Sequence, residues 1–162
     1  MNLHVSTELM DEIVAEALRH INRKSVEYHL NVQSSEEYLL VQVDAKLIIQ
    51  VIINIVDNAI KYTSVGSVIE VHTEKNTEKR QVVVSISDNG PGIPDDQKLH
   101  IFEMFYSGAN KIADSRRSIG LGLSLCKSIV TAHGGTIWVA DNHPKGTVFT
   151  FTLPAGEVEL RE

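Results

Sequence analysis

Hydrophobic positions along the chain recur with the two periods of regular secondary structure. Helical spacing predicts helices over residues 9–21, 45–62 and 120–133. Alternating or short continuous apolar runs predict strands over 26–32, 38–43, 68–73, 81–87, 136–140 and 147–153. Because strands and helices do not alternate regularly, this order favours an α+β fold, a two-layer sandwich with a mixed sheet of about five strands and three helices on one face.

Capping residues and turns indicate where these elements end. Ser6 or Thr7 is the candidate N-cap of the first helix, and Asp44 takes that position before the second. Gly134-Gly135 is expected to end the third helix, since glycine readily adopts the left-handed conformation of a C-cap. The charged residues 74–80 are expected to form the loop of a β-hairpin.

Residues 88–117 interrupt this regular order. The segment begins with Gly and Pro, contains a short helical piece around 99–105, and continues as a polar stretch without periodicity. A long irregular segment inside a compact domain indicates either a functional loop or disorder.

Length and composition fit one soluble domain over residues 1–162, large enough to bury a core without disulfides or metal. A formal net charge of −6 argues against a nucleic-acid partner. The single cysteine, Cys126, lies in an apolar run and is expected to be buried and inert. No run approaches the roughly 20 apolar residues that span a bilayer, and no signal peptide opens the chain. We therefore expect a cytosolic fragment without direct membrane contact.

A polar stripe follows the otherwise apolar second helix. Its side chains are Gln50, Asn54, Asp57, Asn58 and Lys61. At about 100° per residue, Asn54, Asn58 and Lys61 lie within roughly 60° of one another. Carboxamide oxygens suit a hard cation such as Mg²⁺, and an ammonium group suits the phosphates that this cation accompanies. The alternative interpretation is the solvated face of a surface helix.

A glycine-rich turn follows the strand over 81–87. In the sequence Asp88-Asn89-Gly90-Pro91-Gly92-Ile93 the glycines let the backbone approach a ligand, and Asp88 is placed to accept a hydrogen bond from an exocyclic amine such as that of adenine. Guanine presents a carbonyl at that position, so the carboxylate favours adenine by at least about tenfold. An ordinary Asx-Pro-Gly turn has the same pattern.

A second glycine pair, Gly120 and Gly122, opens the third helix. Backbone N–H groups and the positive end of the helix dipole at this point suit a polyphosphate. The segment is not a P-loop, since it lacks a Gly-Lys-Ser/Thr end, and no strand immediately precedes it as a dinucleotide fingerprint requires.

In their joint order, these motifs resemble the nucleotide-binding boxes of one family. They read Asn54-x-x-x-Asn58-Ala59-x-Lys61-Tyr62, Asp88-x-Gly90-x-Gly92-Ile93, Ile101-Phe102-Glu103-x-Phe105-Tyr106, Gly120-Leu121-Gly122-Leu123 and Gly146-Thr147. The order is similar to the N, G1, F, G2 and G3 boxes of sensor histidine kinases in the gyrase, Hsp90, histidine kinase and MutL superfamily. The resemblance covers roughly residues 5–154 and implies a Bergerat-type α/β sandwich that binds ATP.

The resemblance also implies a role for each matching position. Asn58 corresponds to the Mg²⁺ ligand, with Asn54 beside the metal and the phosphates. Lys61 corresponds to a phosphate contact, Tyr62 lies near the nucleoside, and Asp88 corresponds to the residue that recognises adenine. The other nucleotide-binding positions implied in this way are Gly90, Gly92, Ile93, Phe105, Gly120, Leu121, Gly122, Leu123 and Thr147.

Residues 106–119 correspond to a mobile lid over the nucleotide in the same family. Phe102 and Phe105 match the box that packs at the root of this lid. Many relatives have a glycine where this chain has Ser118, which implies a stiffer or differently shaped hinge.

Many relatives also place an arginine where this chain has Ser107. Neutralisation of phosphate charge would then fall to Lys111, Arg116 or Arg117. The stretch Gly108-Ala109-Asn110-Lys111 resembles potassium-responsive, Kdp-type sensor kinases.

None of the seven histidines lies in the His-Glu/Asp, hydrophobic, Ser/Thr-Pro setting of the family's phosphoacceptor. The resemblance therefore implies a protein-histidine kinase fragment that transfers the γ-phosphate of Mg·ATP to a histidine on a separate dimerisation domain, and that reaches a response regulator only indirectly. Such a fragment, the cytosolic portion of a membrane-bound sensor, is expected to be a monomer. His133 is expected to be a helix-end residue stabilised by the helix dipole.

Two other functions are compatible with the same fold. An anti-sigma-type serine kinase usually lacks the aromatic box of residues 102–105, which is present here. A non-catalytic protein-binding module has no need of the set formed by Asn58, Asp88 and Gly120–Gly122. Asn54 stands where ATPases of the superfamily have a glutamate, so rapid hydrolysis of ATP is not expected.

Overall fold

Two β-sheets and four helices make up the described part of the chain. The computed structural model describes residues 1–21, 29–33, 38–63, 66–103 and 122–156. In chain order the elements are β1 (Ser6–Leu9), α1 (Met10–Arg19), β2 (His29–Gln33), β3 (Leu40–Val43), α2 (Ala45–Tyr62), β4 (Val68–Asn76), β5 (Gln81–Asp88), α3 (Asp95–Lys98), α4 (Gly122–Ala132), β6 (Ile137–Asp141) and β7 (Thr147–Pro154).

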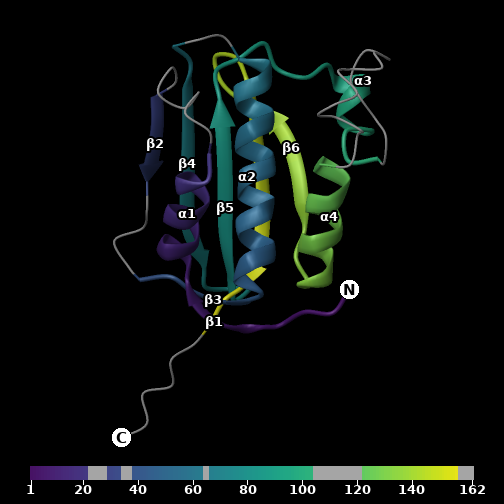
Figure 1. Ribbon diagram of the computed structural model, residues 1–162. Helices are drawn as coiled ribbons and strands as arrows, with labels where there is room; N and C mark the ends of the chain where they lie inside the picture. The colour runs from purple at the N-terminus through teal and green to yellow at the C-terminus, as the bar shows by residue number, and fades with distance from the viewer. Residues whose placement is uncertain (22–28, 34–37, 64–65, 104–121, 157–162) are drawn as a thin grey trace, which may run out of the picture.

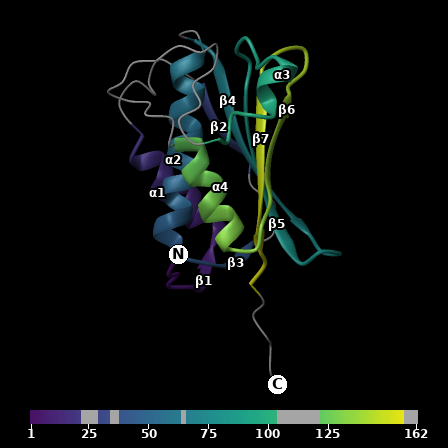
Figure 2. The same cartoon turned by 90° about the vertical axis from the view of Figure 1, so that its right-hand side faces the viewer.

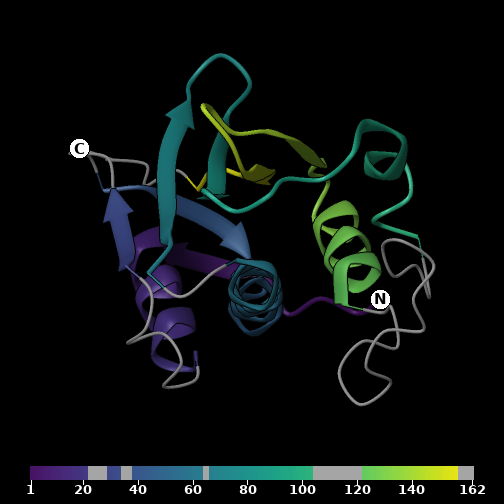
Figure 3. The same ribbon diagram turned by 90° about the horizontal axis from the view of Figure 1, so that it is seen from above.

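The main sheet has five strands in the order β2-β4-β5-β7-β6. β2 is parallel to β4 and the remaining neighbours are antiparallel, so the sheet is mixed, as predicted. Helices α1, α2 and α4 lie side by side over one face of this sheet (Figures 1 and 3). Figure 2 shows the two layers from the side. The predicted two-layer sandwich is therefore confirmed.

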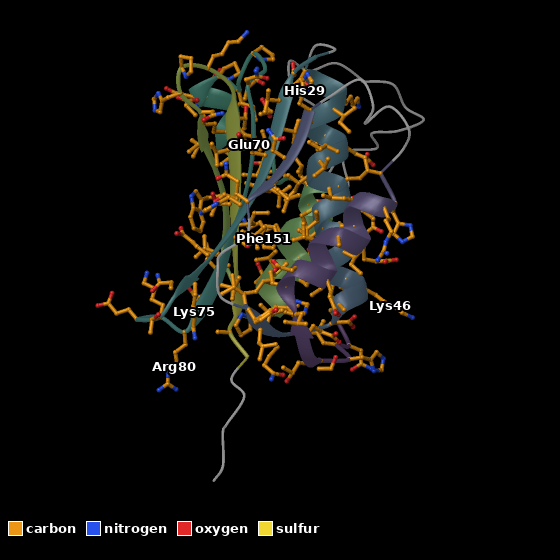
Figure 4. All side chains as sticks on the ribbon, turned by 90° about the vertical axis from the view of Figure 1, so that its left-hand side faces the viewer. His29, Lys46, Glu70, Lys75, Arg80 and Phe151 are labelled. Atoms are coloured by element: carbon orange, nitrogen blue, oxygen red, sulfur yellow. The ribbon has the colours of Figure 1, made fainter. Side chains whose placement is uncertain are left out.

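The core lies between these layers. Alternation along β5 turns Val82, Val84 and Ile86 toward the helices, and all three are buried. From β7, the predicted apolar face of Phe149, Phe151 and Leu153 is buried as well. Figure 4 shows Phe151 between the sheet and the helices. Each such side chain stabilises the fold by about 1.5 to 3 kcal/mol, and this packing fixes α2 relative to the strand ends.

Helix α2 has the predicted bounds. Asp44 occupies its N-cap position, and its backbone oxygen accepts the N–H groups of Leu47 and Ile48. Its carboxylate makes no side-chain cap hydrogen bond and accepts the backbone N–H of His4 at 3.0 Å. This bond is the largest cause of the lowered pKa of Asp44. None of the described helices is long and apolar enough to cross a membrane.

The prediction for the first helix was wrong at its start. Ser6 and Thr7 lie in β1, which pairs antiparallel with β3 in a separate two-stranded sheet. Helix α1 begins only at Met10, whose backbone N–H donates to Leu39 O at 2.8 Å. A strand of four residues is too short for its alternation to be distinguished from the first turn of a helix. The strand with which it pairs is also about 35 residues away in the chain.

Three other predicted boundaries can be compared with the structure. The β4–β5 hairpin extends through Asn76, with a turn at residues 77–80 in place of the predicted loop over 74–80. The short helix is α3, which lies before the predicted piece over 99–105 because Pro94 starts it. Gly134 has a φ of +79°, which confirms the predicted C-cap of α4.

Candidate functional site

The polar stripe of α2 faces the first turn of α4. Asn54 donates from Nδ2 to Gly122 O across a long 3.5 Å contact, and its Oδ1 accepts from Gln50 Nε2 at 2.8 Å. Asn54, Asn58 and Lys61 are half-buried, whereas Gln50 is exposed. Asn54 therefore lies at the edge of the α2–α4 contact, and a fully solvated helix face does not describe the three half-buried side chains.

Beneath this stripe, Cys126 of α4 packs against the backbone of α2. Its Sγ donates to Val51 O at 3.7 Å, and burial raises the pKa of the thiol to about 12. The predicted burial of the cysteine is confirmed, and its inertness stays a prediction that the raised pKa supports.

The first turn of α4 begins the last described stretch of the chain, at Gly122. A Cβ added to Gly122 would meet no heavy atom of the described residues within 4 Å, and Gly122 itself is exposed among them. Leu123 is half-buried and packs against the core. Within the described residues, there is therefore space beside this turn next to Asn54.

Asp88 ends β5 and is buried, with 7% of its surface exposed. Its Oδ1 accepts the backbone N–H of Gly90 at 2.9 Å, and the backbone N–H of Thr147 also donates to this carboxylate. Burial raises the pKa of Asp88, and these two hydrogen bonds oppose that rise. The β5–β7 register, with Ser87 opposite Val148, brings Thr147 to the carboxylate.

The glycines around Asp88 are required by the protein's own packing. A Cβ on Gly146 would come within 2.0 Å of Asp88 O, and the φ of Gly146 is +112°. Gly92, at a φ of +83°, would place a Cβ 3.3 Å from Gly146 O. The sequence analysis explained glycines in this region by the close approach of a ligand. In the structure, the lack of a side chain lets two segments of the protein's own backbone come together.

Thr63 joins the two parts of the site. It is the C-cap of α2, and a Cβ on Gly90 would come within 2.6 Å of its Cγ2. The stripe that begins at Asn54 therefore leads along α2 to the turn after Asp88. Thr63 Oγ1 is buried and has no hydrogen-bond partner among the described residues, so a polar ligand atom or a water beside Gly90 suits it.

His133 lies at the opposite end of the α2–α4 contact, next to the start of α2. Its Nε2 accepts the backbone N–H of Asp44 at 3.0 Å, and its Nδ1 lies 2.8 Å from Ile129 O. Because Nε2 accepts the Asp44 N–H, Nδ1 is the ring atom that faces the Ile129 carbonyl as a donor. His133 does follow the last residue of α4, as predicted, and these two buried hydrogen bonds hold its ring, while its stabilisation by the helix dipole stays a prediction.

Comparison with known proteins decides the family. The family model described as "Histidine kinase-, DNA gyrase B-, and HSP90-like ATPase" matches residues 43–157. The chain belongs to this family. Within it, the motif order and the relatives below identify the ATP-binding domain of a sensor histidine kinase.

Two curated relatives of this histidine kinase domain are sensor proteins. The chain is 42% identical over 147 residues to the sensor protein KdpD of Clostridium acetobutylicum, which covers 91% of this chain and 16% of KdpD. It is 39% identical over 154 residues to the adaptive-response sensory kinase SasA of Microcystis aeruginosa, which covers 94% of this chain and 39% of SasA. The chain therefore spans well under half of either relative, and the predicted similarity to a Kdp-type sensor is confirmed.

Solved structures of histidine kinases have the same fold. The nucleotide-free catalytic domain of ThkA superposes with a TM-score of 0.79 at 30% identity, over 95% of this chain and 97% of that one. The mycobacterial sensor histidine kinase MprB superposes with a TM-score of 0.81 at 25% identity, over 95% and 99% of the two chains.

The histidine kinase domain brings most of its predicted site residues into two neighbouring groups. One group contains Asn54, Asn58, Lys61, Gly122 and Leu123, and the other contains Asp88, Gly90, Gly92, Ile93 and Thr147. Phe102 packs edge to face against Phe149, with ring centroids 6.1 Å apart, in agreement with a core role for the aromatic box. The predicted positions Phe105, Lys111, Gly120 and Leu121, the lid over 106–119 and the side chain of Tyr62 lie outside what the structure describes.

Sequence reasoning missed two residues beside the site. Asn142 donates from Nδ2 to Asp88 O at 2.7 Å, although 54 residues separate them. Thr63 follows the N box directly, yet a threonine after a helix gives no signal of a buried hydroxyl group. An asparagine in the turn Asp141-Asn142-His143-Pro144 indicates only a turn, because its partner is set by the β6–β7 register.

Proposed function

We propose that this domain binds Mg·ATP along α2, between the first turn of α4 and the turn after Asp88, and transfers the γ-phosphate to a histidine on a separate dimerisation domain. One observation carries the proposal: a half-buried polar stripe connects the first described turn of α4 with a buried carboxylate. Helix N-termini favour phosphates, and a buried acceptor favours an amine, so the two ends match the two ends of ATP.

The base end suits adenine. A carboxylate offers about four acceptor positions, and the N–H groups of Gly90 and Thr147 occupy two of them. The remaining capacity accepts the exocyclic amine of adenine, whereas guanine would place a carbonyl oxygen against the carboxylate. A lost charged hydrogen bond costs about 1.5 to 3 kcal/mol, which corresponds to at least about tenfold discrimination.

The phosphate end suits a magnesium ion through Asn58. No hydrogen bond to its half-buried side chain is found within the described residues, while the oxygen of Asn54 already accepts from Gln50. A free carboxamide oxygen fits the ligand preference of this cation. When bound, Mg²⁺ neutralises phosphate charge during phosphoryl transfer. Lys61, on the same stripe, would bind phosphate oxygens.

The transfer itself needs little from this domain beyond placement. A neutral imidazole nitrogen of the partner histidine attacks the γ-phosphorus, the bond from that phosphorus to the β,γ-bridging oxygen breaks, ADP leaves, and the proton on the other ring nitrogen passes to solvent. Because neutral imidazole is already a nucleophile, no base on this domain is required. We propose that the isolated domain is a monomer and hydrolyses ATP at near-background rates. Rapid turnover without a histidine-bearing partner would favour an ATPase instead.

A response regulator is the proposed downstream partner. The solved complex of ThkA with the response regulator protein TrrA, at 30% identity to this chain, supports this step. The relatives do not favour the serine kinase or the non-catalytic module.

Calorimetric titration of Mg·ATP and Mg·GTP tests the proposal. The wild type should prefer ATP by at least about tenfold and should need Mg²⁺. Asp88→Asn should reduce the preference for ATP, and Asn58→Asp should weaken binding because it adds negative charge beside the phosphates. The exposed substitutions Asp96→Asn and Asn31→Asp make the same chemical changes elsewhere and should leave binding unchanged. A folded wild type that binds neither nucleotide would refute the proposal.

A further inference from the structure

The turn between β6 and β7 lies against the end of β5. From this turn, Asn142 donates its Nδ2 to the backbone oxygen of Asp88 at 2.7 Å. Gly146, at the other end of the same turn, packs against that oxygen so closely that a Cβ would reach 2.0 Å. The backbone of Asp88 is therefore held by a segment that forms no part of the proposed nucleotide contacts except through Thr147.

Both polar atoms of the Asn142 side chain, and its backbone N–H, have hydrogen-bond partners. Its Oδ1 accepts the backbone N–H of His143 at 2.9 Å, and its own backbone N–H donates to Gly146 O at 3.0 Å. With the oxygen bound to a donor, the nitrogen must point toward an acceptor, which is Asp88 O. The side chain is half-buried, so water competes only partly for this bond.

The same turn also contacts α3, the helix that follows the segment over 89–94. Asp141, next to Asn142, accepts from Lys98 Nζ at 2.8 Å, and Lys98 is the last residue of α3. The Lys98 side chain is only 16% exposed, and it also pairs with the exposed Asp95. One end of the segment is thus bound at Asp88 and the other through α3.

We propose that the β6–β7 turn holds the turn after Asp88 in position, an interaction called the brace below. In this brace, Asn142 is a positioning residue for Asp88. By holding the Asp88 carbonyl, its amide sets the direction in which the chain leaves β5. That direction sets where the Gly90 and Thr147 N–H groups meet the carboxylate, and hence which carboxylate positions remain for the base. The consequence for nucleotide choice rests on the proposed function, whereas the brace itself does not.

The experiment compares Asn142→Ala with the exposed control Asn31→Ala. Amide ¹H–¹⁵N resonances of Gly90 and Thr147 should shift in Asn142→Ala and stay unchanged in Asn31→Ala. ATP affinity should fall about five- to tenfold in Asn142→Ala, while the affinity for tripolyphosphate, which has no base, should not change. Asn142→Asp, which keeps the shape but loses the donor, should behave like the alanine variant and guards against a folding defect of one substitution.

Two results would overturn the brace. Unmoved Gly90 and Thr147 resonances in folded Asn142→Ala would show that the bond does not position Asp88. An equal loss of ATP and tripolyphosphate affinity would indicate a general structural role. If the wild type bound no ATP, the proposed function would fall, and the amide resonances alone would confirm or overturn the brace.

Discussion

The two ends of the candidate site are built in opposite ways. At the base end, Asp88 is buried, its carboxylate accepts two backbone N–H groups, and its carbonyl accepts a third donor from Asn142. At the phosphate end, a Cβ on Gly122 would meet no heavy atom of the described residues within 4 Å, and Asn54 reaches Gly122 O only across 3.5 Å. A base is recognised by fixed geometry, whereas phosphates and a metal supply their own strong interactions, so only the first end needs to be rigid beforehand.

The largest test of this contrast substitutes one glycine at each end. Gly146→Ala forces a Cβ to within 2.0 Å of Asp88 O at a φ of +112°, so we expect a loss of about 3 kcal/mol in the free energy of unfolding. Gly122→Ala adds a methyl group that meets no heavy atom of the described residues within 4 Å, and should change that free energy by less than about 1 kcal/mol. Urea denaturation measures both. Equal losses would mean that the two ends are equally packed.

A second test separates stability from nucleotide choice. His133→Ala leaves the Asp44 N–H without its buried partner at the end of α2 that lies away from the site, and should cost about 1 to 3 kcal/mol. The preference for ATP over GTP should stay at the wild-type value. His72→Ala, at an exposed histidine, is the control and should change neither quantity. A lost preference in His133→Ala would show that the base end depends on distant packing.

The smallest effect concerns the charge of Asp88. Burial raises the pKa of Asp88 in the folded state, so protonation of this carboxyl group favours the folded form. The contribution of Asp88 to stability is therefore present below its ordinary pKa of 3.8, and it is lost as the pH rises through the raised pKa. The stability of the wild type relative to Asp88→Asn should therefore decrease as the pH rises above about 4. Urea titrations of both proteins across this range measure the difference. A pH-independent difference would contradict the burial effect.

Local patterns predicted the elements that have a strong period. The apolar rows of α2 gave its bounds, and Phe149, Phe151 and Leu153 marked the inner face of β7. Ser6 and Thr7 were misassigned because a strand of four residues that pairs with a distant partner has almost no local signature. Periodicity reports burial, and the partner of a short edge segment is decided by tertiary contacts.

The candidate site shows the same division. Asn54, Asn58, Asp88 and Gly122 could be found from motif order, since their chemistry is local to each box. Asn142 could not, because its contact with Asp88 depends on the register of β6, β7 and β5. Gly146 was found, but the reason for the glycine, a close backbone contact with Asp88, required coordinates.

The small β1–β3 sheet, at the end of the molecule opposite α3 (Figure 1), has a mechanical consequence. Ser6 pairs with Val43, the residue just before Asp44, and His4 donates directly to the Asp44 carboxylate. The same β3 strand is bridged to Ala155 after β7. Tension applied to residues 1–5 would therefore act on β3 and, through Asp44, on the first turn of α2. A force applied at this end of the molecule would act on α2, the helix that carries Asn54, Asn58 and Lys61.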